Sequence, residues 1–141
     1  MKRLGIYYQA SMALTTLGWI LIIGFPTSDF TDKAVVGIVA ALCISYGYIL
    51  FFYKGDKSKS YPKGSFKSFQ GVFNLFQNPK GVFAGWLHFL AFDLMIGLYI
   101  KNDSIENGLT FWWIIPSLIL TLMLGPLGLL SYFIIKFVVV G

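Results

Sequence analysis

The sequence predicts an all-α fold: a four-helix transmembrane bundle with an interfacial amphipathic helix between the second and third spans and a fourth span kinked at a proline. Of the 141 residues, 57% are hydrophobic and only 12% are charged, about half the charged share of a soluble domain. The apolar residues form continuous blocks, not the periodic patterns of water-facing elements. Four blocks reach the ~20 residues that a helix needs to cross the hydrocarbon. We expect residues 1–141 to form a single integral membrane domain.

The four predicted spans cover residues 4–26, 34–53, 82–100 and 109–137. The first follows Met-Lys-Arg, as a secretory signal does. Its apolar run is longer than the ~7 to 15 residues of a signal core, and it ends in Gly-Phe-Pro without a small-x-small cleavage pattern. We therefore predict a retained helix. No Ser- and Arg-rich transit segment precedes it, so we expect a bacterial inner membrane protein, or a mature plant form in a plastid membrane.

Basic residues gather on one predicted side of the membrane. The segment 54–82 carries six lysines against Asp56 alone, and the N-terminal end adds Lys2 and Arg3. The other two connections, TSDFTDK and KNDSIENG, each hold two acids and one lysine. The positive-inside rule therefore predicts that both termini, with Lys136, and the long loop face the cytoplasm. The lysines suit anionic lipid headgroups, and with no recognised motif we expect no nucleic-acid partner.

The segment SFKSFQGVFNLFQ, residues 65–77, predicts an amphipathic helix at the membrane interface. Wound at about 100° per residue, its apolar side chains fall within an arc of roughly 120°, and its polar side chains gather elsewhere. Pro79 is expected to end it. The alternative is a loop that is merely rich in phenylalanine. The apolar set is Phe66, Phe69, Val72, Phe73 and Phe76, and the polar set is Lys67, Gln70, Asn74 and Gln77.

The last apolar block is interrupted by Gly-Pro-Leu-Gly at residues 125–128. Pro126 cannot donate a hydrogen bond to the carbonyl of Leu122, and the flanking glycines loosen the backbone or permit close approach. We expect a kink there. Backbone groups freed by such a kink must find partners in protein or trapped water. The kink can serve packing alone or can border a functional site.

The third predicted span contains an aspartate, Asp93, and the only histidine of the chain, His88. A charge at the middle of a membrane helix costs ~2.5 to 3.5 kcal/mol on insertion scales, so Asp93 either stays protonated or faces donors inside the bundle. Such carboxyls are candidates for function. Five residues of a straight helix place the two side chains roughly 140° apart, so they should not touch. His88 can equally be a histidine bonded to a neighbouring helix.

Metal and cofactor chemistry have little basis in this composition. The single histidine and the single cysteine, Cys43, lie in different blocks, whereas a zinc or di-iron site takes about four ligands. An axial haem ligand at His88 stays open. The sequence has no nucleophile elbow, phosphate-binding loop or dinucleotide fingerprint. We therefore expect no metal and no cofactor.

Two segments, GVFNLFQNPKGVFAGWLHFLAFDLMIGLYI and PSLILTLMLGPLGLLSYFIIK, resemble the neoxanthin-synthase-like membrane family known from the plant abscisic-acid-deficiency proteins. The resemblance covers nearly the whole chain from residue 5 and is most specific in these segments. The architecture of that family is similar to the one predicted above, with four membrane helices and no recognised cofactor motif. The residues that carry it are Gly85, Trp86, His88, Leu90, Ala91, Phe92, Asp93, Gly97, Pro116, Leu120, Gly125, Pro126, Gly128 and Leu129.

The resemblance implies a hydrophobic polyene or isoprenoid ligand. The plant members are required to convert violaxanthin to neoxanthin, a redox-neutral opening of an epoxide that loses a neighbouring proton and leaves an allene. Such an isomerisation needs an acid and a base, and the resemblance implies Asp93 as the acid and His88 as the base. Because no plastid transit segment is seen, we expect a different carotenoid or a polyprenoid as substrate. The candidate substrate-binding residues are Trp86, Gly97, Phe92, Asn74 and Pro126.

Two other functions compete with a carotenoid isomerase. A non-catalytic membrane protein that binds or organises carotenoid would show the same aromatic-rich spans, because aromatic residues also fill ordinary membrane interiors. A transporter is disfavoured, since four spans with one carboxylate and no internal repeat fall short of the usual inverted-repeat design. Assembly into a homo-oligomer would remove that objection. The expected partners are thus the lipid bilayer, a hydrophobic ligand and further copies of the chain.

Overall fold

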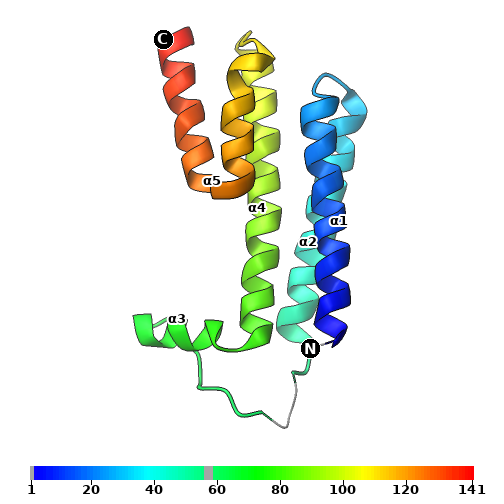
Figure 1. Cartoon of the computed structure of the whole chain (residues 1–141), viewed down its shortest axis with the longest axis vertical. Coiled ribbons are helices and arrows are strands. Elements are labelled where there is room, and N and C mark those ends of the chain that lie inside the picture. Colours follow the sequence, from blue (N-terminus) through cyan, green and yellow to red (C-terminus); the bar gives the residue numbers. More distant parts are fainter. Residues whose placement is uncertain (1, 56–58) are drawn as a thin grey trace.

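The computed structural model describes residues 2–55 and 59–141 and is all-helical over those residues. Asp56 and Lys57, two of the charges counted in the long loop, lie outside the described residues. Four of the described helices are long and apolar enough to cross a membrane, and the remaining one, the third along the chain, is short. Figure 1 shows the long helices side by side, with the short helix across one end of α4. The helices are α1 (Lys2–Gly24), α2 (Asp29–Phe51), α3 (Phe69–Phe76), α4 (Pro79–Glu106) and α5 (Phe111–Val140).

Helix α4 is the centre of the fold and packs against every other helix. Its buried face includes Leu87, Leu94 and Ile100, which are fully enclosed. In a membrane, helices associate by close packing and not by exclusion of water, so small residues at the interfaces matter. Gly18 of α1 receives the side chain of Leu94, whose methyl carbon would lie 2.7 Å from an added Cβ. Any larger residue at position 18 would push α1 away from α4.

The ends of α4 differ from the predicted span of 82–100. Pro79 does not only follow α3: it occupies the first turn of α4, where its missing N–H costs nothing. Asn78 caps this end, accepting a hydrogen bond from the Lys80 backbone N–H at 2.9 Å. At the other end the helix continues to Glu106 through residues that the sequence predicted to be a loop. Hydropathy alone missed these turns because their polar side chains are paired within the fold.

The interfacial segment forms a helix over Phe69–Phe76, shorter than the predicted 65–77. Ser68 begins it, because its Oγ accepts a hydrogen bond from the Gly71 N–H at 3.1 Å. Phe66 therefore lies outside the helix, although the phenylalanines on either side of the boundary are exposed. Gly85 of α4 accepts the ring of Phe76, which fixes α3 against the first turns of α4.

The predicted interruption of the last span is present, and its consequence is larger than a kink. Leu124 has non-helical backbone angles, φ −142° and ψ 68°, two residues before Pro126. After this break the chain reverses direction, so that α5 is a helical hairpin (Figure 1). The Oγ atoms of Ser117 and Ser131, one on each limb, lie 2.8 Å apart. Each limb alone is shorter than the ~20 residues of a full crossing.

The reversal also changes the predicted topology of the termini. The N-terminal end of α1 lies beside the start of α4, with Leu4 and Lys80 lining one small pocket. Lys136, near the C-terminus, instead bonds Asp103 close to the end of α4, at 2.7 Å. The two termini therefore lie at opposite ends of the bundle (Figure 1). The prediction that both termini and Lys136 lie on the basic side assumed a straight fourth helix. That placement does not fit this fold.

Candidate ligand cleft

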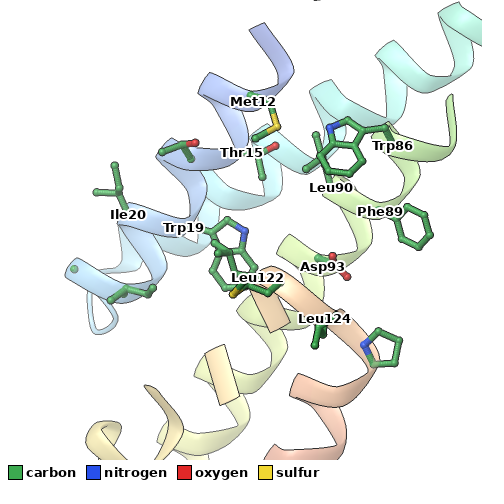
Figure 2. Close-up of a pocket in the computed structure, with 16 residues that line it drawn as sticks. Met12, Thr15, Trp19, Ile20, Trp86, Phe89, Leu90, Asp93, Leu122 and Leu124 are labelled. Carbon is green, nitrogen blue, oxygen red and sulfur yellow. The ribbon is translucent and has the colours of Figure 1, made fainter. Parts of the chain in front are cut away.

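An open, mostly apolar cleft of about 940 Å³ lies between α1, the middle of α4 and the reversal of α5. We call it the central cleft. Figure 2 shows the side chains of these three elements directed toward it. Its volume is at the upper end of the ~300 to 1,000 Å³ common for ligand sites. The lining residues are Met12, Thr15, Thr16, Trp19, Ile20, Ile23, Gly24, Trp86, Phe89, Leu90, Asp93, Leu122, Met123, Leu124, Gly125 and Pro126.

Among the described residues that line the central cleft, Asp93 is the only ionisable one. Its side chain is half-buried, and it projects from α4 toward the broken segment of α5 (Figure 2). Within residues 2–55 and 59–141, no group donates a hydrogen bond to its carboxyl oxygens, although buried polar side-chain atoms elsewhere in these residues all have partners. A free carboxyl in an apolar setting is therefore available to a ligand that brings its own polar group.

The reversal of α5 sets the position of this carboxyl. Gly125 lies against Asp93 so closely that an added Cβ would overlap the carboxyl oxygen Oδ1. The residue after it, Pro126, also lines the cleft. The helix break that sequence reasoning assigned to packing or function thus forms the wall next to the polar group. Glycine at 125 is required here for close approach, and not for an unusual backbone angle.

On the opposite wall, Trp19 of α1 is held by a glycine of α4. An added Cβ at Gly97 would lie 2.6 Å from the Cη2 atom of the Trp19 ring, so the edge of the ring lies against the helix at that point. Trp19 is 5% exposed. Gly97, predicted to bind substrate, lies behind this ring and does not line the cleft. It contributes by letting Trp19 form the wall.

Three of the predicted site residues do line the central cleft: Asp93, Trp86 and Pro126. His88 does not. Its ring is stacked on Phe92, with centroids 4.5 Å apart and planes at 22°, and it faces Tyr46 of α2 at 6.1 Å. Phe92, predicted to bind substrate, belongs to this outer stack and is exposed. The helical rotation computed from the sequence correctly separates the two polar groups, and it places them on different surfaces of α4.

Asn74, the remaining candidate, lies on α3. Its side-chain amide donates to the carbonyl oxygen of Lys63 at 3.2 Å and accepts from Gln70 at 3.0 Å. These bonds tie the preceding loop to the helix. The residue does not line the central cleft.

The α1 wall was missed in the sequence. Thr15, Thr16 and Trp19 follow one another around one side of α1 and line the cleft. Thr15 satisfies its hydroxyl within the helix by donating to the Ser11 carbonyl at 2.8 Å. A tryptophan close to two threonines within an apolar block was the available signal, but aromatic residues are so common in these spans that it stood out little.

A second set of polar residues, which we call the end cluster, lies where α1 meets α2 and α4 meets α5. The ammonium of Lys101, only 2% exposed, forms an ion pair with Asp32 and donates to the Pro26 carbonyl at 3.0 Å. Asp103 accepts hydrogen bonds from the Tyr132 hydroxyl and from Lys136. These contacts join α2 to α4, and α4 to the returning limb of α5. Their geometry is that of structural ties, because each charged group is paired.

Comparison with known proteins identifies relatives of the chain. A family model described as ABA DEFICIENT 4-like matches residues 6–132. Protein ABA DEFICIENT 4, chloroplastic, from Arabidopsis thaliana is 23% identical over 124 residues, which are 84% of this chain and 55% of that protein. The chain thus spans about half the length of the curated relative it matches. No solved structure matches it.

Proposed function

The chain belongs to the ABA DEFICIENT 4-like family, and on that premise we propose that it is a membrane protein that holds a carotenoid or related isoprenoid in the central cleft and isomerises it with Asp93. One observation carries the proposal: a carboxyl that has no hydrogen-bond partner among the described residues lies in an apolar cleft formed by helices long enough to cross a membrane. A lipid-soluble ligand can enter such a cleft from the bilayer. An intramembrane carboxyl with no structural partner needs a ligand or a reaction to account for its cost.

The proposed reaction is the redox-neutral opening of an epoxide to an allenic alcohol. A protonated Asp93 gives its proton to the epoxide oxygen, and the C–O bond breaks while the O–H bond forms. The resulting carboxylate then removes a proton from the neighbouring carbon, so that the electrons of that C–H bond form the new C=C bond. The carboxyl is regenerated, and neither an oxidant nor a reductant is required.

This scheme differs from the pair of groups expected from the sequence. His88 packs in the outer stack with Phe92 and does not line the central cleft, so one carboxyl serves as both acid and base. The epoxide oxygen and the neighbouring carbon that loses its proton lie close together in the substrate. The two oxygens of a single carboxyl group can therefore serve both atoms. Trp86, Trp19 and Phe89 offer flat surfaces to the polyene beside it.

A non-catalytic carotenoid-binding protein is the second candidate, and the openness of the cleft favours it. Catalysis gains from exclusion of water and lipid around the reacting group, whereas the central cleft is open on one side. In that role Asp93 would donate a hydrogen bond to a hydroxyl or epoxide oxygen of the pigment and hold it in one orientation.

The orientation we propose follows from the charges at the two ends. The end that carries Arg3, Lys54 and Lys80 faces the cytoplasm or the equivalent compartment, and α3 lies along the interface on that side. The end cluster, with its acids, faces the other compartment. The C-terminus then lies on that second side as well, because α5 reverses. Assembly into a homo-oligomer, with lipid around the exposed apolar faces, is compatible with this placement.

The test is conversion of a supplied pigment by the purified protein. The protein is reconstituted with an epoxycarotenoid, and products are separated and identified by their absorbance spectra and masses. We expect the wild type to form an isomer of unchanged mass. We expect the conversion rate of Asp93→Asn to be lower by at least about 100-fold. His88→Gln is the matched control on the same helix and should convert the pigment as the wild type does. Pigment that stays bound but unchanged would support the binding protein instead, and no bound pigment would refute both.

A further inference from the structure

A second groove continues from the central cleft along α1 and α4 toward α3. It measures about 650 Å³ and is lined by Leu4, Gly5, Tyr8, Gln77, Pro79, Val82, Phe83 and Trp86. Trp86 lines both spaces. The rings of Tyr8 and Trp86 approach each other from α1 and α4, with centroids 6.2 Å apart, at the boundary between them. The two spaces therefore adjoin at Trp86 on the α1–α4 side of the bundle, and we refer to them together as the channel.

The reversal of α5 explains why the second groove exists. The turn of the hairpin lies beside Asp93, since Gly125 contacts its carboxyl. From there toward Pro79 the α5 hairpin no longer covers α4, and the next element on that side is α3 at the end of the bundle (Figure 1). A straight fourth helix would have continued alongside this part of α4. The hairpin thus leaves an uncovered strip of α4 that begins at the proposed reacting group.

The channel extends unequally on the two sides of Asp93. Toward α3 it runs from Asp93 to Pro79, about 21 Å along α4 at 1.5 Å per residue. On the other side, α1 is level with Asp93 near Gly18, which packs against Leu94, and the cleft ends at Gly24, about 9 Å further along that helix. The second groove, which forms the far part of this arm, is lined by apolar residues apart from Tyr8 and Gln77.

We infer that the ligand is bound in one direction, with its reacting end at Asp93 and its hydrocarbon chain in the second groove, pointing toward α3. This inference rests on the proposed function and adds the place and direction of the ligand's chain. A compact isoprenoid would fill the central cleft alone and gain nothing from the second groove. The tail would lie across the Tyr8–Trp86 ring pair and reach Gln77, whose amide can bond a polar group at the far end.

Gly5 offers a way to fill the second groove without touching the central cleft. A Cβ added at Gly5 meets nothing within 4 Å, so a leucine there occupies open space in the groove. Gly37 of α2 also has nothing within 4 Å and lines neither space, which makes Gly37→Leu the matched control. Val82→Phe narrows the groove from α4 and serves as a second, independent variant.

The experiment compares a full-length epoxycarotenoid with a shortened apocarotenoid that keeps the same epoxide end. Affinities are measured by quenching of tryptophan fluorescence in lipid nanodiscs, with thermal unfolding as the check of folding. We expect Gly5→Leu and Val82→Phe to weaken binding of the full-length pigment by about 10-fold or more and to leave the short pigment unchanged. Gly37→Leu should bind both as the wild type does.

Two results overturn the inference in different ways. If both groove variants bind the full-length pigment as the wild type does, while conversion still depends on Asp93, the tail lies elsewhere and the proposed function stands. If the wild type binds neither pigment, the proposed function fails and the inference fails with it.

Discussion

The two polar regions of α4 differ in how their carboxyls are satisfied. Asp103, in the end cluster, accepts hydrogen bonds from a buried tyrosine and from a lysine. Asp93, about 15 Å away along the helix, has no donor among the described residues and opens into the central cleft. A paired carboxyl secures neighbouring helices, whereas an unpaired one costs stability and provides chemistry. The comparison teaches that partners, more than position in the helix, distinguish the structural carboxyl of Asp103 from the carboxyl of Asp93, to which we assign the proposed function.

The Asp103 contacts of the end cluster exist only if α5 reverses, so the first prediction tests the reversal. In a Cys43→Ser background, the double variant Ser117→Cys/Ser131→Cys should form an internal disulfide almost completely on mild oxidation, because the two Oγ atoms are 2.8 Å apart. In a straight helix these positions would be about 21 Å apart. Mass spectrometry of the digested protein detects the link, and each single-cysteine variant is the control. Absence of the internal link would contradict both the hairpin and the contacts of Asp103 with Tyr132 and Lys136.

The second prediction concerns the buried ammonium of Lys101. Asp32→Ala leaves that charge without its partner, and because the Asp32 side chain is 44% exposed we expect a cost of about 1 to 3 kcal/mol, below that of breaking a fully buried pair. We expect a large loss of stability in thermal unfolding in detergent, with pigment conversion retained below the transition. Asp29→Ala, in the same first turn of α2, is the control and should cost only about 0.3 to 1 kcal/mol. Equal effects of the two variants would show that the ion pair contributes little.

The third prediction moves the carboxyl of Asp93 without removing it. Gly125→Ala places a methyl group where that carboxyl now lies, and misplacement of a reacting group by about 1 Å can cost roughly 100-fold in rate. We expect conversion to fall by about that factor, measured by product formation, while the fold is kept. Gly37→Ala has open space around its Cβ and should convert pigment normally. An unchanged rate in Gly125→Ala would mean that the position of this carboxyl is unimportant.

The fourth prediction isolates one hydrogen bond of the end cluster. Tyr132→Phe keeps the ring, which is fully buried, and removes the hydroxyl that donates to Asp103. Hydrogen bonds to charged groups contribute about 1.5 to 3 kcal/mol, so we expect a loss of that size in chemical unfolding. Tyr99, whose ring meets Tyr132 edge-on at 6.3 Å, supplies the control Tyr99→Phe with an expected change under about 0.5 kcal/mol. A loss as large in the control would assign the effect to ring packing.

Much of the fold could be predicted because apolar blocks of membrane-spanning length leave few alternatives to helices. The break near Pro126 was predictable for the same reason, since proline removes a backbone donor. The direction of the chain after the break was not, because it depends on contacts between residues far apart in sequence, such as Lys136 with Asp103. Likewise, the polar residues in the last turns of α4 predicted a loop, because the sequence does not show that Lys101 pairs with Asp32 of α2.

The candidate site was predictable in part. Asp93 stands out in any sequence reading, because a carboxyl in an apolar helix is costly. His88 was interpreted as a base because the reaction implied by the resemblance needs one. The sequence does not indicate which side of α4 packs against a neighbouring helix, so it could not show that His88 lies outside the cleft that Asp93 lines. Trp19 was missed because aromatic residues are common in these spans, and nothing in the sequence distinguishes the one that lines the cleft.

The most direct test of the account measures unfolding and pigment conversion on the same samples of Asp93→Asn and Asp103→Asn. The account predicts a crossed result. Asp93→Asn keeps the unfolding temperature of the wild type and loses conversion by about 100-fold or more. Asp103→Asn lowers the unfolding temperature, because Lys136 loses a charged partner, and keeps conversion per folded molecule. An Asp93→Asn variant that unfolds as early as Asp103→Asn, or that still converts the pigment, would contradict the division between a functional and a structural carboxyl.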